Sequence, residues 1–112
     1  MQRLKGGMRL TRDQILSSIA KGIGDGAWVL AALAWHGKPV AKEKLRDITN
    51  AYYRRAKPDE VEMPIRSRHL LDEMAARLEG AALVTVFPKG KAKMYMVSEL
   101  GNELIQHMRK GG

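Results

Sequence analysis

The sequence predicts a single domain that is mainly α-helical with one small β-hairpin, an α+β fold. Five segments have a helical pattern of apolar residues, while only residues 84–97 read as two short β-strands joined by a turn. The chain has 112 residues, enough for one hydrophobic core. Its composition, 45% apolar and 29% charged, is typical of a folded globular protein rather than a disordered one.

The first two predicted helices are separated by a glycine cluster. Thr11 precedes Gln14 by three residues, which is the spacing of a capping box, and apolar residues at helical intervals predict a helix over about 12–21. The segment GIGDG that follows is similar to a nucleotide-binding loop, but such a loop follows a strand, and here a helix precedes it. We therefore interpret it as a helix stop. Residues 27–37 are apolar on nearly every face, which predicts a helix at the centre of the core.

The middle of the chain predicts two more helices around an acidic connector. Val40 is predicted to enter a very short strand, and residues 41–57 are amphipathic. The connector PDEVEMP is bracketed by prolines, which disfavour a helix there. Leu70, Leu71, Met74 and Leu78 then predict a helix over about 65–79.

The last part of the chain predicts a hairpin and a final helix. The runs on either side of PKGK form the hairpin, with Gly90 at its bend. Ser98 is predicted to cap the last helix, in which Leu100, Leu104, Ile105 and Met108 recur at helical spacing. The predicted order is four helices, a hairpin and a helix.

Positive charge is concentrated in two segments. The net charge is +8, and residues 1–12 carry four basic residues and no acidic one. The predicted hairpin carries Lys89, Lys91 and Lys93, also without an acid. We predict a flexible basic arm over residues 1–10, a single domain over residues 11–110, and a polyanion-binding surface. The alternative is that these lysines only keep the protein soluble.

The predicted element order and several residues resemble a known family. The segments LLDEMAARLEGAALVTV and KMYMVSELGNELI are similar to the recognition helix, wing and final helix of winged-helix transcriptional regulators of the MarR and PadR kind. Members of that family commonly have a glycine directly before the Leu-Val that begins the wing, where this sequence has Ala82. The resemblance implies a winged helix-turn-helix with additional N- and C-terminal helices, and a DNA-binding transcriptional regulator as the function.

This interpretation assigns candidate contacts with double-stranded DNA. A helix inserted in the major groove reads bases with residues near its N-terminal end. The candidates for groove contact are therefore Arg66, Ser67, Arg68 and His69, while the three hairpin lysines would contact phosphates of the backbone or minor groove. In the arm, the candidates for minor-groove contact are Arg3, Lys5 and Arg9.

The apolar stripes of the first and last helices also predict a homodimer. The residues assigned to that interface are Ile15, Leu16, Ile19, Leu104, Ile105 and Met108. The alternative is that both stripes complete the core of the monomer. Two other functions remain open: a winged helix used for protein–protein interaction, and a nonspecific chromatin or nucleic-acid-binding protein.

Catalysis and cofactor binding are not predicted. There is no cysteine, and the three histidines lie on different predicted helices without the spacing of metal ligands. We expect no enzyme activity, no cofactor and no metal. A small-molecule effector between Trp28 and Trp35 is the alternative to core packing of these rings. The longest apolar run is far shorter than a membrane span, so we expect a cytoplasmic protein associated with the nucleoid.

Overall fold

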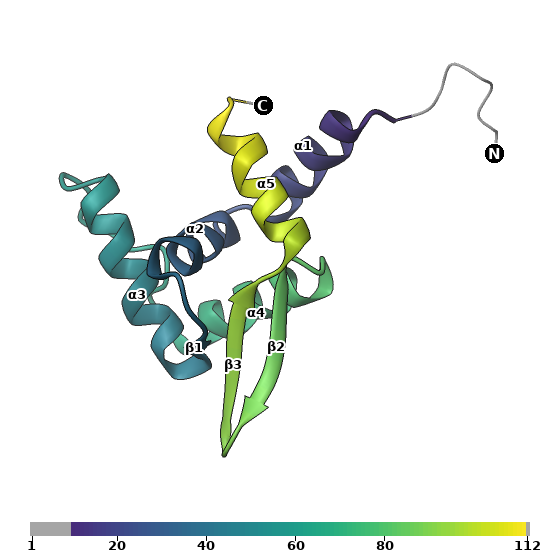
Figure 1. Ribbon diagram of the computed structural model, residues 1–112. Coiled ribbons are helices and arrows are strands. Elements are labelled where there is room, and N and C mark those ends of the chain that lie inside the picture. Colours follow the sequence, from purple (N-terminus) through teal and green to yellow (C-terminus); the bar gives the residue numbers. More distant parts are fainter. Residues whose placement is uncertain (1–9, 112) are drawn as a thin grey trace.

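The computed structural model describes residues 10–111 and confirms the α+β winged-helix class (Figure 1). Arg3, Lys5 and Arg9 lie outside the described residues, as does the predicted arm apart from Leu10. Along the chain, the elements are α1 (Arg12–Ile23), α2 (Gly26–His36), β1 (Val40–Ala41), α3 (Lys42–Ala56), α4 (Arg68–Gly80), β2 (Val84–Lys89), β3 (Ala92–Val97) and α5 (Glu99–Arg109).

The helix α4 begins three residues later than the sequence predicts. Ser67 has an extended backbone, and its hydroxyl oxygen accepts a hydrogen bond from the backbone N–H of Leu70 at 3.2 Å. This is the geometry of an N-cap residue, so the helix begins after Ser67, and the residues before it belong to the connector. Arg66 and Ser67 therefore precede the helix, and only Arg68 and His69 belong to its first turn.

The helix α2 is the centre of the fold, as its apolar composition predicts. It contacts α1, α3, α4, α5 and β3. Leu30 is completely buried and Leu33 almost so, and both belong to the hydrophobic core cluster. Because the other elements surround α2, most sides of the helix require apolar residues.

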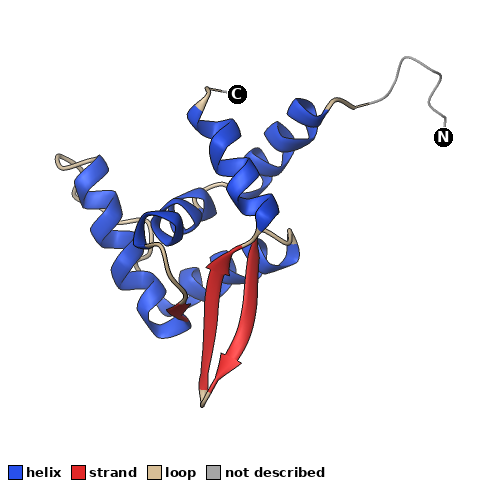
Figure 2. Cartoon of the chain, in the orientation of Figure 1, coloured by secondary structure: helices blue, strands red, loops and turns tan. Residues whose placement is uncertain are grey.

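A three-stranded antiparallel sheet carries the wing (Figure 2). The strand order is β1-β3-β2, and Tyr95 of the central strand pairs with Val40 on one side and Val86 on the other. Tyr95 is only 1% exposed, so it anchors the sheet in the core. Beyond β1, only β2 and β3 continue, and they turn at Gly90, which has a positive φ of 63°. We call this projecting hairpin, residues 84–97, the wing.

The wing is held to its neighbours at a junction of α4, β2 and α5. The Ser98 hydroxyl donates to the carbonyl of Ala82 at 2.7 Å, and the Ser98 backbone N–H donates to the carbonyl of Leu83 at 3.0 Å. Ser98 also caps α5, since its hydroxyl oxygen accepts from the N–H of Gly101 at 3.0 Å. A Cβ on Gly101 would lie 2.2 Å from the carbonyl oxygen of Leu83, so only glycine lets α5 approach this closely.

The terminal helices α1 and α5 pack against each other in the protomer. Arg12 forms an ion pair with Glu103, which raises the pKa of Arg12 and lowers that of Glu103. His107 is 8% exposed, and its Nε2 lies 3.0 Å from the Ser17 hydroxyl. A polar contact in a half-buried groove thus fixes one helix against the other.

The residues assigned to the predicted dimer interface differ in their burial within this chain. Leu16, Leu104 and Ile105 are buried at 5%, 0% and 4% exposure, within the core cluster of the protomer itself. They complete the monomer core because α1 and α5 close over it. Of the other three, Ile15 is exposed, while Ile19 and Met108 are half-buried against the core.

Gly101→Ala should destabilise the protein by about 2–3 kcal/mol, because the new methyl group meets the backbone carbonyl of Leu83, which a hydrogen bond from Ser98 holds in place. The free energy of unfolding in urea measures this. Gly22→Ala is the matched control, since its Cβ would have no neighbour within 4 Å and alanine favours the helix. Equal stability of the two variants would contradict the close contact at the junction.

Ala82→Gly should stabilise the protein by about 0.5–1 kcal/mol. Ala82 is the one non-glycine residue with positive φ in the described chain, at 60°. That conformation costs an L-residue roughly 1–2 kcal/mol, and the added flexibility of glycine in the unfolded chain cancels only part of the gain. Thermal and urea unfolding measure the difference, and a loss of stability would mean that the alanine methyl contributes packing that outweighs the strain.

Candidate nucleic-acid interface

The start of α4 is held in place by α3. The side-chain amide of Asn50 donates to the carbonyl of Ile65 at 3.1 Å and accepts from the N–H of Ile65 at 3.3 Å. Arg46 donates to the carbonyl of Arg66 at 3.3 Å. Ile65 itself is 1% exposed, so the connector ends in the core. These contacts give the long connector a fixed exit into α4, which its length alone does not predict.

Arg66 stands at the edge of this exit. Its guanidinium lies 3.8 Å from the Glu62 carboxylate, and it donates to the carbonyl of Met63 at 3.3 Å. The Arg66 side chain remains 56% exposed. Surface ion pairs of this kind contribute about 0–1 kcal/mol, so the pair with Glu62 opens at little cost.

Asp72 gathers two cations beside the first turn of α4. Its carboxylate lies 2.7 Å from the ammonium of Lys42 and 3.4 Å from the guanidinium of Arg68. The hydrogen bond from Lys42 is the main reason that the pKa of Asp72 lies below its ordinary value. The carboxylate is therefore ionised at neutral pH and holds both cations at the surface.

Sequence reasoning missed Lys42, Arg46 and Asn50 at this site. All three lie on α3 and meet the connector or α4 only through tertiary packing. The helical pattern marks Lys42 and Arg46 simply as water-facing residues. The two hydrogen bonds between Asn50 and the backbone of Ile65 cannot be predicted from the sequence, because an asparagine within a helix has no preferred partner.

Ser67 and His69 complete the predicted groove contacts. Both are exposed, and His69 lies in the first turn of α4. The oxygen of Ser67 serves the N-cap hydrogen bond, which leaves its hydroxyl hydrogen as a donor. Arg66, Ser67, Arg68 and His69 are thus consecutive, exposed and located at the N-terminal end of one helix.

The structure divides the three wing lysines into two kinds. Lys89 and Lys91 flank the turn at Gly90 and are exposed at the tip. Lys93 instead faces the ring of Tyr95, with its ammonium 5.7 Å from the ring centroid and 3.8 Å from the Glu79 carboxylate. The interaction with Tyr95, followed by that with Glu79, raises the pKa of Lys93. Lys93 is therefore oriented toward Tyr95 and the last turn of α4, unlike its two neighbours.

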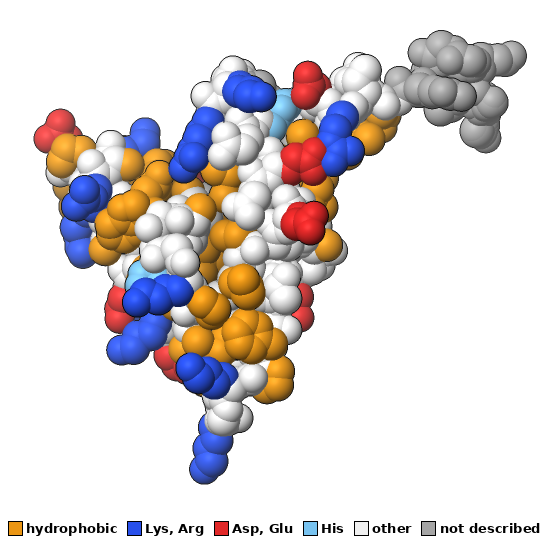
Figure 3. Space-filling view, viewed as in Figure 1, with side chains coloured by type: hydrophobic (Ala, Val, Ile, Leu, Met, Phe, Trp, Pro, Cys, Tyr) orange, Lys and Arg blue, Asp and Glu red, His pale blue; other side chains and the backbone are white. Residues whose placement is uncertain are grey.

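The wing and α4 lie in the same half of the molecule. In Figure 1 the wing extends away from α1 and from the C-terminal end of α5, and α4 runs beside its base. Lys42–Asp72 connects α4 to α3, and Lys93–Glu79 connects its last turn to β3. Figure 3 shows lysine and arginine side chains at the tip of the wing and beside its base, and further ones spread over the upper and left parts of the same face.

Metal sites, membrane spans and the space between the two tryptophans can be checked over residues 10–111. Within that range, no three histidine, aspartate or glutamate side chains are grouped so as to hold a metal ion. No helix in the same range is long and apolar enough to cross a membrane. Trp28 and Trp35 both pack against Tyr52. The centroid of the Tyr52 ring lies 6.1 Å from that of Trp28 and 5.6 Å from that of Trp35, so Tyr52 fills space between the two tryptophans.

Comparison with known proteins places the chain in a family. The DNA-binding protein TubR of Bacillus cereus (strain ATCC 10987 / NRS 248) is 34% identical over 113 residues, covering 96% of this chain and 94% of the relative. The chain belongs to the TubR family. No protein-family model matches it. The likeness to TubR supports the predicted general class, a DNA-binding winged-helix protein. Membership of the MarR or PadR family in particular remains a prediction from the sequence.

Asp72→Asn should strengthen binding to duplex DNA about threefold to tenfold at low salt in this TubR-family protein. The change removes a negative charge near the first turn of α4 and releases Lys42 and Arg68 for phosphates. Fluorescence anisotropy with a labelled duplex measures the affinity. Asp59→Asn in the exposed connector makes the same charge change away from α4, and an equal gain in that variant would refute a local effect.

Proposed function

We propose that the protein is a duplex DNA-binding regulator that places the N-terminal end of α4 in a major groove and the tip of the wing on the neighbouring backbone or minor groove. The observation that carries the proposal is the pairing of an exposed basic helix start, Arg66–His69, with a basic wing tip on the same half of a winged-helix fold. The TubR relative, a DNA-binding protein by name, supports the same class of function.

The two parts of this surface have different roles in the proposal. Arginine forms paired hydrogen bonds with guanine, so Arg66 and Arg68 are the residues that would read bases. Their present partners, Glu62 and Asp72, are exposed carboxylates in weak ion pairs. A groove lined with hydrogen-bond acceptors and phosphates competes well with such pairs. Base reading thus requires only side-chain rearrangement at the start of α4.

The wing supplies affinity more than sequence choice. Lys89 and Lys91 can each neutralise a phosphate, and each phosphate contact adds roughly 0.9 to the slope of log affinity against log salt. Lys93 should contribute slightly less, because its ammonium must first leave the ring of Tyr95 and a weak ion pair with Glu79. Binding should therefore be strongly dependent on salt.

The proposal also includes two details that the sequence predicts, control of transcription and a homodimer. The protein would control transcription by occupying an operator, as MarR and PadR regulators do. A homodimer would present two of these surfaces to two half-sites. Its contacts would involve Ile15, which is 43% exposed, and Leu10, which is 66% exposed, rather than the buried residues of α5.

Replacing Lys89 and Lys91 together by alanine should lower the salt slope of duplex binding by about 1.8 while leaving the preference among duplex sequences unchanged. The test is a series of anisotropy titrations from low to physiological salt. The double variant should also bind duplex DNA more weakly at low salt, since the tip of the wing then lacks its two exposed cations.

The matched control is the double variant Lys21→Ala, Lys110→Ala. These lysines lie in the last turn of α1 and at the end of α5, and they change the net charge by the same amount. An equal loss of slope in both double variants would show that only net charge matters. If the unaltered protein binds no duplex even at low salt, the proposal fails and the protein-interaction module is favoured.

A further inference from the structure

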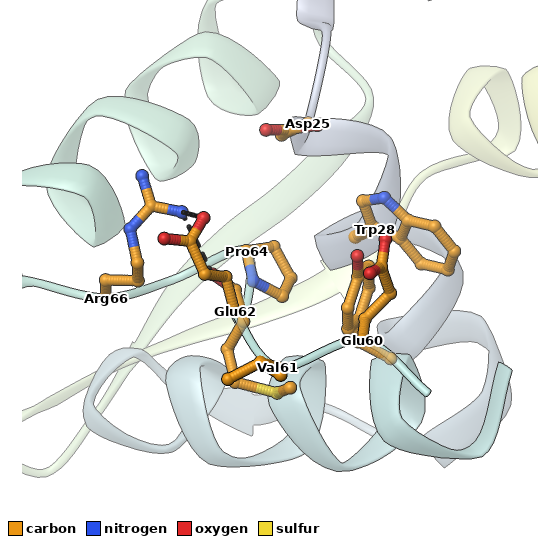
Figure 4. Close-up of a pocket in the computed structure, with 9 residues that line it drawn as sticks. Asp25, Trp28, Glu60, Val61, Glu62, Pro64 and Arg66 are labelled. Atoms are coloured by element: carbon orange, nitrogen blue, oxygen red, sulfur yellow. Dashed lines mark hydrogen bonds and ion pairs between the residues drawn. The ribbon is translucent and has the colours of Figure 1, made fainter. Parts of the chain in front are cut away.

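A cleft lies between the α1–α2 joint, the C-terminal part of α3 and the connector (Figure 4). Trp28 and Tyr53 form part of its wall, Pro64 lies on the connector side, and the carboxylates of Asp25, Glu60 and Glu62 surround it. Its volume is about 290 Å³. This equals the liquid volume of roughly ten water molecules, which is enough space for a small organic molecule or the end of a long side chain.

The aromatic residues give the cleft its shape. The rings of Trp28 and Tyr53 have centroids 4.7 Å apart and planes at 79°, so they meet edge to face. In this arrangement the edge of one ring covers part of the face of the other, and both rings are only half-buried, so the pair leaves aromatic surface open to the cleft. The negative face of an aromatic ring attracts a cation within about 6 Å, and clustered aromatic rings recognise alkylammonium groups.

The charges around the cleft act in the same direction. Three carboxylates line it against a single guanidinium, that of Arg66, which is already paired with Glu62 at 3.8 Å. The pKa of the Tyr53 hydroxyl is raised, first by desolvation and then by the negative charges of Glu60, Asp25 and Glu62. The three carboxylates therefore favour a positive charge beside the aromatic wall, although the protein as a whole carries +8.

We propose that this cleft binds a compact organic cation of the alkylammonium or guanidinium class. The open aromatic surface of the Trp28–Tyr53 pair contacts the cation, and Glu60 with Asp25 supplies the countercharge. An anion would be repelled by the carboxylates. A bare metal ion does not fit, because metal ions need several converging oxygen ligands, and the carboxylates of the described chain are not grouped in that way.

The same chemistry can come from two sources, a free amine or guanidine and a lysine or arginine side chain at the end of a peptide. Both present the cationic group that the cleft recognises. The cleft does not coincide with the proposed DNA contacts except at Arg66, and its occupation can be measured without DNA. The inference therefore stands or falls separately from the proposed function.

Trp28 serves as the reporter of binding in a Trp35→Phe background. Trp35 lies outside the cleft and packs on Tyr52, so phenylalanine keeps an aromatic ring at that position and leaves Trp28 as the one indole. Indole fluorescence is titrated with choline and agmatine at constant ionic strength. We expect a saturable change with a dissociation constant of about 1 mM or tighter for at least one of them.

The neutral isostere of choline, in which carbon replaces the quaternary nitrogen, is the ligand control. It should bind at least about tenfold more weakly, since it fills the same space without charge. If choline, agmatine and the neutral isostere all give no saturation up to about 50 mM, or if the isostere binds as well as choline, the proposal is wrong.

Two variants of the connector provide the protein control. Glu60→Gln should weaken binding of the cation at least about fivefold, whereas Asp59→Asn, one residue away and outside the cleft, should change it less than about twofold. Both residues are exposed, so both variants should fold, which circular dichroism checks. Equal effects of the two would overturn the assigned site.

A blocked tripeptide with a central arginine distinguishes the two sources. Tighter binding of the peptide than of agmatine indicates that the cleft takes a side chain of a polypeptide. Tighter binding of agmatine indicates a free small molecule. Either result supports a cation site, and failure of both ligands together with choline is the negative result described above.

Discussion

The close approach of α5 to the carbonyl of Leu83 is the contact on which the geometry of the molecule depends. It requires Gly101, because any Cβ there would overlap the carbonyl oxygen. Ser98 joins the two sides of the junction, donating through its hydroxyl to Ala82 and through its backbone N–H to Leu83. Since α4 ends and β2 begins at this point, the junction fixes the direction of the wing relative to α4. The proposed contact of α4 and the wing with one DNA duplex depends on this fixed angle.

The basic surface is not a uniform patch of free charge. Arg66, Arg68 and Lys93 each have a carboxylate within 4 Å, whereas Lys89 and Lys91 flank the exposed turn of the wing. Exposed ion pairs contribute little to stability, about 0–1 kcal/mol, and are screened by salt. They nevertheless set the resting orientation of the side chains at the start of α4. The cations of the wing tip are the ones positioned for long-range attraction of a polyanion.

The connector between α3 and α4 takes part in two different surfaces. On one side, Asn50 and Arg46 fix its last residues and so the start of α4. On the other side, Glu60 lies beside the aromatic wall of the cleft, and Glu62 lines the opposite end, where its carboxylate points toward Arg66. Glu62 belongs to both, because it lines the cleft and pairs with Arg66. The acidic residues of the connector thus lie at two places, beside Arg66 and along the cleft.

The sequence by itself determined the class of fold, the order of the elements and the position of the wing. These depend on local information: helical periodicity in five segments, the capping residues Thr11 and Ser98, and a strand–turn–strand pattern around Gly90. Cap geometry depends on neighbours along the chain, which explains why the N-terminal limits of α1 and α5 agree with the sequence. The start of α4 was predicted wrongly because Ser67 takes an extended backbone at the end of a connector held by α3.

Only the tertiary structure decided which charged and apolar residues meet. Leu16 and Ile105 are buried in the protomer because α1 and α5 close over one core, a contact between segments far apart in the chain. Lys42 joins the candidate DNA surface, and Lys93 turns toward Tyr95 and Glu79, for the same reason. A periodic pattern states which face of a helix is apolar, but it contains no information about the partner of that face. Distances between side chains on different elements are set by packing, and packing is a property of the whole chain.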